Sequence, residues 1–303
     1  MRLRSNIEVR RCRPLLGTFV EITGRGRDEG LLARGIEAGF DAIGRVNRLM
    51  SFHDPLSDVS RMNRDAFPRG VIVHPWTWQV VKAAKRFAEE SHGTFDITVA
   101  PLLTKWSYLP GRCYQFSQTA TSRDIFLRRN YEVFFRRHLV VDLGGIAKGF
   151  AVDRAVKALK DNGITAGIVN AGGDLRSFGP ASHLVHVRHP ADPARVAGAV
   201  RLRERSMATS GIYFERRKYK GQYVSPLLDG RNDRSVRELI SVSVAAAECM
   251  VADALTKIVF TLRETAAGLL AQYHADALLV ERDGTPSWIF HSLCDTRDRA
   301  QFA

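Results

Sequence analysis

The 303-residue sequence contains few of the patterns that would place it in a specialised class of protein. Its four cysteines form no Cys-x-x-Cys pair, so neither a zinc site nor a redox dithiol is predicted. No run approaches the ~20 apolar residues that a membrane-spanning helix needs, and we expect no stable membrane insertion. The first residues hold no apolar core of a secretory signal, or of a lipoprotein leader ending at Cys12, so we expect a cytoplasmic protein.

The usual nucleotide and nucleic-acid signatures are also missing. The sequence contains neither a G-x-G-x-x-G run nor a Walker A loop. Lys and Arg outnumber Asp and Glu, 45 against 32, which would attract phosphate-bearing partners. The excess is mostly arginine spread over polar stretches without RNA-binding aromatic residues, which favours a solvated basic surface over a nucleic-acid partner.

The hydrophobic pattern predicts a mixed α+β chain that forms one domain, residues 1–303. Apolar residues spaced three to four apart predict helices at 31–50, 76–91, 146–159, 249–262 and 264–273. Runs rich in β-prone residues predict strands at 15–22, 139–143, 166–169, 184–188, 197–202, 240–245, 277–281 and 287–290, and the Thr-Ser-Gly run at 209–211 predicts a loop. The expected fold is a compact mixed α/β sandwich containing strand-helix-strand units, with a ligand crevice between two lobes.

Two glycine-paired turns follow predicted strands in the middle of the chain. The first carries Asp142, Gly145 and Lys148 at the start of a predicted helix, where free N–H groups and a cation would receive a diphosphate. The second carries Gly172 and Gly173, and we expect it to line the same crevice. A plain tight turn explains either segment equally well when it is taken alone, and for the following Asp174 a turn-capping role is favoured.

Two further segments place carboxylates among apolar residues. Asp96 lies inside a strand-like stretch at 93–103, where it either contacts a ligand or caps a neighbouring helix. Asp253 and Thr256 fall three apart on a predicted helix and therefore share one face, which suits a hard cation such as Mg²⁺. The alternative is an ion pair between Asp253 and Lys257, four residues apart.

These segments, in this order, resemble the FAD:protein FMN transferase family, also called the ApbE family. The resemblance rests on LLGTF near the start, MSFHDPLSDVSRMN, GTFDITVAPLLTKW, VDLGGIAKG, NAGGD, ATSG and ADAL, and it covers most of the chain. It implies an α+β fold, related to the T-fold, that binds FAD together with Mg²⁺. It also implies that FMN is transferred from FAD to a Thr or Ser hydroxyl of an acceptor flavoprotein, with release of AMP.

The resemblance also implies roles for individual residues. The positions implied to contact FAD are Leu16, Phe52, Thr94, Phe95, Asp96, Asp142, Lys148, Gly172, Gly173 and Leu227. The implied metal ligands are Gly145, Asp253 and Thr256, and the implied catalytic residues are Asp253, Thr256 and Lys257.

The sequence departs from the family at two points. Lys257 stands where the family usually has a threonine, and segment 226–230, PLLDG, lacks the family's histidine. Thr256 would supply the hydroxyl, or the Lys257 ammonium would replace part of the metal's charge. A second hypothesis is therefore an FAD-binding protein that slowly hydrolyses FAD, and a third is a basic nucleic-acid-binding protein.

Overall fold

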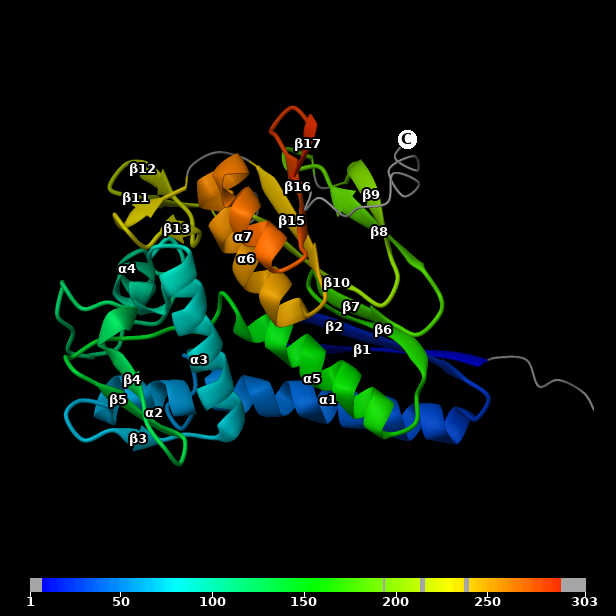
Figure 1. The fold of residues 1–303 in the computed structure, drawn as a ribbon, viewed down its shortest axis with the longest axis horizontal. Coiled ribbons are helices and arrows are strands. Elements are labelled where there is room, and N and C mark those ends of the chain that lie inside the picture. The colour runs from blue at the N-terminus through cyan, green and yellow to red at the C-terminus, as the bar shows by residue number, and fades with distance from the viewer. Residues whose placement is uncertain (1–6, 193, 213–215, 237–239, 290–303) are drawn as a thin grey trace, which may run out of the picture.

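The computed structural model describes residues 7–192, 194–212, 216–236 and 240–289. Figure 1 shows a large sheet with helices packed along it, and a smaller lobe of short elements beside it. Cys294 and the last residue of the predicted strand 287–290, Phe290, lie outside the described residues. No described helix combines the length and the hydrophobicity needed to cross a bilayer.

The large sheet has eight strands in the order β1-β2-β6-β7-β10-β15-β16-β17. Every neighbouring pair is antiparallel. Their bounds are β1 (Ile7–Leu15), β2 (Thr18–Gly26), β6 (Ala166–Ala171), β7 (Asp174–Phe178), β10 (Ser206–Gly211), β15 (Ser241–Ala246), β16 (Asp276–Val280) and β17 (Pro286–Ile289). One end of the sheet's strands brings together the β1–β2 turn, the β6–β7 turn and the end of β10. This follows from the register, because Val20 pairs with Ala171 and Leu175 pairs with Met207.

Two sequence predictions in this region were wrong, and the bounds of a third were shifted. Segment 139–143 forms no strand and pairs with no described strand, so the predicted strand-helix-strand unit is absent from the described structure. The predicted strand 15–22 is instead the turn and second strand of a hairpin, whose Arg-rich first strand lies at the edge of the sheet. The predicted loop 209–211 belongs to β10, where pairing with β15 outweighs the weak strand preference of Ser and Gly.

Three long helices cover one face of the sheet, namely α1 (Glu29–Met50), α5 (Ala147–Asp161) and α6 (Cys249–Leu262). Their apolar faces form the main core together with Val20 and Val169 of the sheet. Gly149 allows α5 to approach α6, because a Cβ there would lie 2.3 Å from the Cys249 carbonyl oxygen. The predicted helix 264–273 is a 3₁₀ turn, η3 (Arg263–Ala266), followed by α7 (Ala267–Gln272).

The opposite face of the sheet is covered in part by a hairpin of β8 (His183–Arg188) and β9 (Val196–Leu202). Val187 and Leu202 of this hairpin pack on Leu175, Met207 and the sheet residues beside them in a second, smaller core.

The smaller lobe holds α2 (Asp58–Asp65), α3 (Pro75–Glu90), η1 (Ile97–Val99), α4 (Ala100–Lys105), η2 (Ser122–Asp124) and the sheet β3-β5-β4. These strands are β3 (Val71–Ile72), β4 (Ile125–Leu127) and β5 (Glu132–Phe135), and two small hairpins add β11 (Arg217–Tyr219), β12 (Gln222–Val224), β13 (Leu228–Asp229) and β14 (Arg234–Ser235). The strand-like prediction for 93–103 was wrong, since the segment forms a loop and two short helices. The chain is thus a mixed α/β fold whose two parts leave space between them.

Candidate active site

A cleft of about 1080 Å³ lies between the smaller lobe and the end of the large sheet that carries the β1–β2 and β6–β7 turns. The predicted site residues that line it are Leu16, Thr94, Phe95, Asp96, Asp142, Gly145, Lys148, Gly172, Gly173, Leu227 and Lys257. The two glycine turns do line one cleft, as expected, although the sheet is antiparallel. Asp253 pairs with Lys257 but does not itself line the cleft. Thr256 and Phe52 do not line it either.

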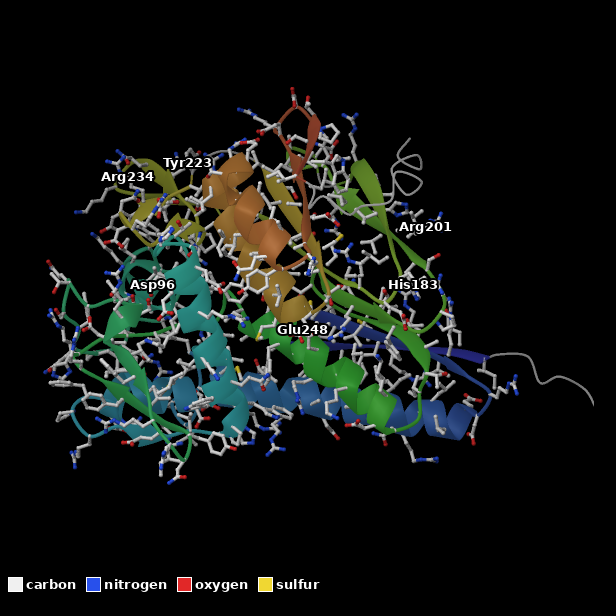
Figure 2. All side chains as sticks on the ribbon, viewed as in Figure 1. Asp96, His183, Arg201, Tyr223, Arg234 and Glu248 are labelled. Carbon is white, nitrogen blue, oxygen red and sulfur yellow. The ribbon has the colours of Figure 1, made fainter. Side chains whose placement is uncertain are left out.

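The smaller-lobe wall of the cleft is the loop between α3 and η1, where Figure 2 labels Asp96. Asp96 caps η1, because its Oδ1 accepts from the Thr98 backbone N at 2.8 Å, while its Oδ2 accepts from the Ser122 hydroxyl at 3.1 Å. Asp96 therefore caps a neighbouring helix while it also lines the cleft. The Thr94 hydroxyl is buried and has no hydrogen-bond partner among the described residues, so the cleft offers it to a ligand.

The Asp142 turn forms the next part of the wall. The backbone N–H of Asp142 donates to the Ile97 carbonyl at 2.9 Å, which joins this turn to η1. Its carboxylate accepts from the Gly144 N–H at 3.0 Å. Desolvation raises the pKa of Asp142 above its ordinary value, despite that hydrogen bond.

Two lysine–aspartate ion pairs, Lys148–Asp174 and Lys257–Asp253, form the floor of the cleft. Both carboxylates are buried, and both lysines line the cleft. The second oxygen of Asp253 accepts from the Gly149 N–H at 3.0 Å. The second oxygen of Asp174 is buried without a partner among the described residues.

The two pairs interact electrostatically. Burial by itself lowers the pKa of Lys148, but the carboxylates of Asp174 and Asp253 together raise it above its ordinary value. Burial and the neighbouring Asp253 raise the pKa of Asp174, against the effect of Lys148. The floor therefore keeps a charged ammonium facing the cleft, which suits an anionic ligand.

The sequence interpretation of Asp174 as a turn cap was wrong. Asn170 serves the β6–β7 turn instead, because its side-chain oxygen accepts from the Gly173 N–H at 3.0 Å. Asp174 starts β7 and points at Lys148 on α5, a contact between residues 26 apart in the chain. The sequence holds no local signal for that contact.

The structure separates two predicted residues from the cleft. The Thr256 hydroxyl donates to the Asp253 carbonyl at 2.7 Å and lies 2.8 Å from the Ser210 hydroxyl, so only Ser210 reaches the cleft. Phe52 is buried against Tyr114 in an edge-on ring contact, which corrects its assignment as a cleft residue.

Sequence reasoning missed Asp153, which fixes the start of α6. Helix α6 has no side-chain cap of its own, and Asp153 from α5 accepts from the N–H groups of Cys249 at 3.0 Å and Met250 at 2.8 Å. Arg176 of β7 pairs with the same carboxylate. This contact places Asp253, one turn further on, beside Lys257 and the cleft.

Sequence reasoning also missed Arg216, which lines the cleft in the smaller lobe. Its guanidinium lies 4.3 Å from the Tyr223 ring centre, and its buried Nε has no hydrogen-bond partner among the described residues. Arg216 therefore gives the cleft a positive charge on its smaller-lobe wall, in addition to the lysines of the floor. No pattern around Arg216 in the sequence sets it apart from the other arginines.

The model of the ApbE family matches residues 16–279. The chain belongs to the ApbE family. A FAD:protein FMN transferase of Klebsiella pneumoniae (strain 342) is 25% identical over 283 residues, covering 89% of this chain and 88% of the relative. A FAD:protein FMN transferase of Vibrio cholerae is 28% identical over 230 residues, covering 69% of this chain and 68% of the relative.

Solved ApbE structures share the fold. The crystal structure of the ApbE protein from Thermotoga maritima matches with a TM-score of 0.82 and 28% identity, covering 93% of this chain and 96% of that one. The resemblance inferred from the ordered motifs is therefore confirmed as family membership, and the mixed α/β fold is confirmed with it.

Proposed function

We propose that this protein transfers FMN from FAD to a threonine or serine hydroxyl of an acceptor flavoprotein and releases AMP. The observation that carries the proposal is the pair of ammonium groups, Lys148 and Lys257, on the floor of a long cleft in a chain whose relatives are FAD:protein FMN transferases. Two charged lysines beside glycine turns suit a diphosphate, the one group that FAD must present for cleavage.

In the proposed reaction the acceptor hydroxyl oxygen bonds to the FMN-side phosphorus, and the hydroxyl releases its proton to water. The bond between that phosphorus and the bridging oxygen breaks, and AMP leaves with the bridging oxygen. Lys148 and Lys257 hold the diphosphate and balance its charge, while Gly145 and Gly172 leave room for close approach of the backbone. Thr94, whose hydroxyl has no partner among the described residues, would orient the flavin half.

The chain's own residues fit a Mg²⁺ ion at this site. A buried carboxylate oxygen of Asp174 has no partner among the described residues, and hard cations prefer such oxygens. Asp174 and Asp253 would hold the ion, together with the backbone carbonyl of Gly145, which the resemblance implies as a ligand. No cluster of three His, Cys, Asp or Glu side chains that could hold a metal is found among the described residues. The ion would supply charge stabilisation to the diphosphate as it is cleaved.

A second candidate function is FAD binding with slow hydrolysis, in which water replaces the acceptor hydroxyl. The pairing of Lys257 with Asp253 favours it, because the ammonium occupies an oxygen that the metal would use. Under this candidate, Lys257→Thr frees Asp253 and raises turnover.

The test is an assay of purified protein with FAD, a threonine-bearing acceptor, and either Mg²⁺ or EDTA. We expect AMP release and acid-stable flavin on the acceptor, both lost in Asp253→Ala. Lys157→Met removes a lysine from an exposed ion pair on α5 and serves as the matched control. Normal transfer by Asp253→Ala would refute the metal assignment, and AMP release without protein-bound flavin would favour the hydrolase.

The cytoplasmic location stays a prediction, which cell fractionation would test. The absence of a nucleic-acid partner also stays a prediction, and a salt titration of RNA binding would expose one through a steep salt dependence.

A further inference from the structure

The cleft extends beyond its charged floor onto the outer face of the large sheet. Five residues paired across neighbouring strands form a row there: Cys12, Glu21, Asn170, Leu175 and Met207. Directly paired residues point to the same face of an antiparallel sheet, and this face is opposite the helices. All five line the cleft, and we name this row, with the β8 wall described next, the sheet groove.

The wall of the sheet groove is strand β8. Val185, His186, Val187 and Arg188 are consecutive, and all four line the cleft. Side chains of consecutive strand residues point to opposite faces, so these four side chains cannot all face the cleft. The four residues therefore line it through the backbone edge of β8. Figure 2 marks the hairpin with His183 at the start of β8 and Arg201 on β9.

That edge is open to pairing. Among the described residues β8 pairs only with β9, and none of its backbone groups bonds to a described residue outside that ladder. A strand edge with N–H and C=O groups facing a groove is a template for an added extended chain. The groove meets the charged floor at the β6–β7 turn, where Asn170 of the groove accepts from the Gly173 N–H and both residues line the cleft.

We propose that the acceptor polypeptide binds in the sheet groove as an extended segment that adds a strand to the free edge of β8. This inference rests on the proposed function, since the acceptor hydroxyl must reach the diphosphate above Lys148 and Lys257. The groove opens onto that floor, so a segment paired with β8 carries its threonine or serine toward it. Main-chain pairing gives affinity with little dependence on acceptor sequence.

Cys12 provides a test that leaves the fold intact. It is exposed on the groove floor, whereas Cys113 is exposed away from the cleft and Cys249 is buried. In one variant, Cys113→Ser and Cys294→Ser leave Cys12 as the reactive thiol. In the matched control, Cys12→Ser and Cys294→Ser leave Cys113. Both are coupled to fluorescein maleimide, a label bulky enough to fill a peptide groove.

The probe is a synthetic peptide of about nine residues, the length of a long strand, with alternating valine and serine and a central threonine. Its binding is followed by anisotropy of a rhodamine tag, and FAD binding is followed separately by equilibrium dialysis. We expect a peptide Kd below about 1 mM for the unlabelled and Cys113-labelled proteins. Labelling Cys12 should weaken peptide binding about tenfold or more and leave FAD binding within about twofold.

Two N-methylated peptides test main-chain pairing itself. Methylating one alternate set of amides should abolish binding, while methylating the other set should be tolerated, because only every second N–H of an added strand faces β8. Equal effects of the two sets would overturn the proposal. So would the absence of peptide binding, undiminished binding after Cys12 labelling, loss of FAD binding on Cys12 labelling, or a stable dimer that protects Cys12.

Failure of the proposed function gives a different result. If the peptide binds as described but no AMP or peptide-bound flavin is formed, the groove stands as a polypeptide-binding site and the transferase assignment fails.

Discussion

Two ion pairs in this protein have the same helical spacing and opposite surroundings. Lys257 and Asp253 on α6 leave 18% and 0% of their side chains exposed, whereas Lys157 and Asp161 on α5 leave 56% and 57%. The side chains of the exposed pair stay in contact with water, so their attraction is weak and worth about 0.3–0.5 kcal/mol. The buried Asp253 carboxylate has lost its water, so its charge depends on Lys257. Spacing predicts that an ion pair forms, and burial decides what it does.

The largest expected effect is removal of the buried carboxylate. Asp253→Ala leaves the Lys257 ammonium without its partner and frees the Gly149 N–H. We expect the free energy of unfolding, measured by urea denaturation, to fall by about 3–5 kcal/mol. The matched change in the exposed pair, Asp161→Ala, should cost at most about 0.5 kcal/mol. Equal losses would show that burial does not separate the two pairs.

The next effect concerns the contact that buries Asp253. A Cβ at Gly149 would lie 2.3 Å from the Cys249 carbonyl oxygen and 2.8 Å from the Asp253 Cβ, so Gly149→Ala pushes α5 from α6. We expect it to lower the unfolding free energy by about 1–3 kcal/mol and to weaken FAD binding. Gly44→Ala on α1 meets only the end of Arg48, and should stabilise the protein by about 0.5–1 kcal/mol. Stabilisation by both changes would contradict the packing argument.

A double-mutant cycle measures the two pairs directly. Combining Asp253→Ala with Lys257→Met removes both charges of the pair, so the double variant should be more stable than Asp253→Ala alone. We expect a coupling energy above about 1 kcal/mol for this pair, and about 0.5 kcal/mol or less for Lys157 with Asp161. Coupling energies of the same size would place Asp253 in water rather than in the protein interior.

The smallest effect concerns Thr256, whose hydroxyl bonds to Ser210 and the Asp253 carbonyl. We expect Thr256→Val to lower the unfolding free energy by about 1 kcal/mol, since it removes these bonds. Because the hydroxyl does not reach the cleft, AMP release should stay within about twofold of the unchanged protein. Loss of AMP release in a folded variant would restore Thr256 as a metal ligand.

Local patterns predicted the helices well and the sheet less well. The helix 249–262 was predicted to the residue, because its apolar run is bounded clearly. Strand β1 was missed because only Val9 is buried in it, so its sequence lacks an apolar alternation. Residues 209–211 of β10 were predicted as a loop because pairing with two neighbouring strands outweighs their weak strand preference. Strand formation depends on partners distant in the chain, which a local pattern does not contain.

The site divides in the same way. The glycine turns and the face carrying Asp253 follow from local spacing, and the ordered motifs implied the family. The contacts of Asp174 with Lys148 and of Asp153 with the start of α6 join residues 26 and 96 positions apart. Only the folded chain brings them together, so local spacing indicates the Asp253–Lys257 pair of the floor but not the Lys148–Asp174 pair.

The most direct test of the account is the ratio of AMP released to flavin that remains on the acceptor after acid precipitation. Transfer of FMN at the lysine floor predicts one AMP for each protein-bound flavin, with both products lost in Asp253→Ala. AMP formed in excess with free FMN, or bound flavin formed without AMP, would contradict it.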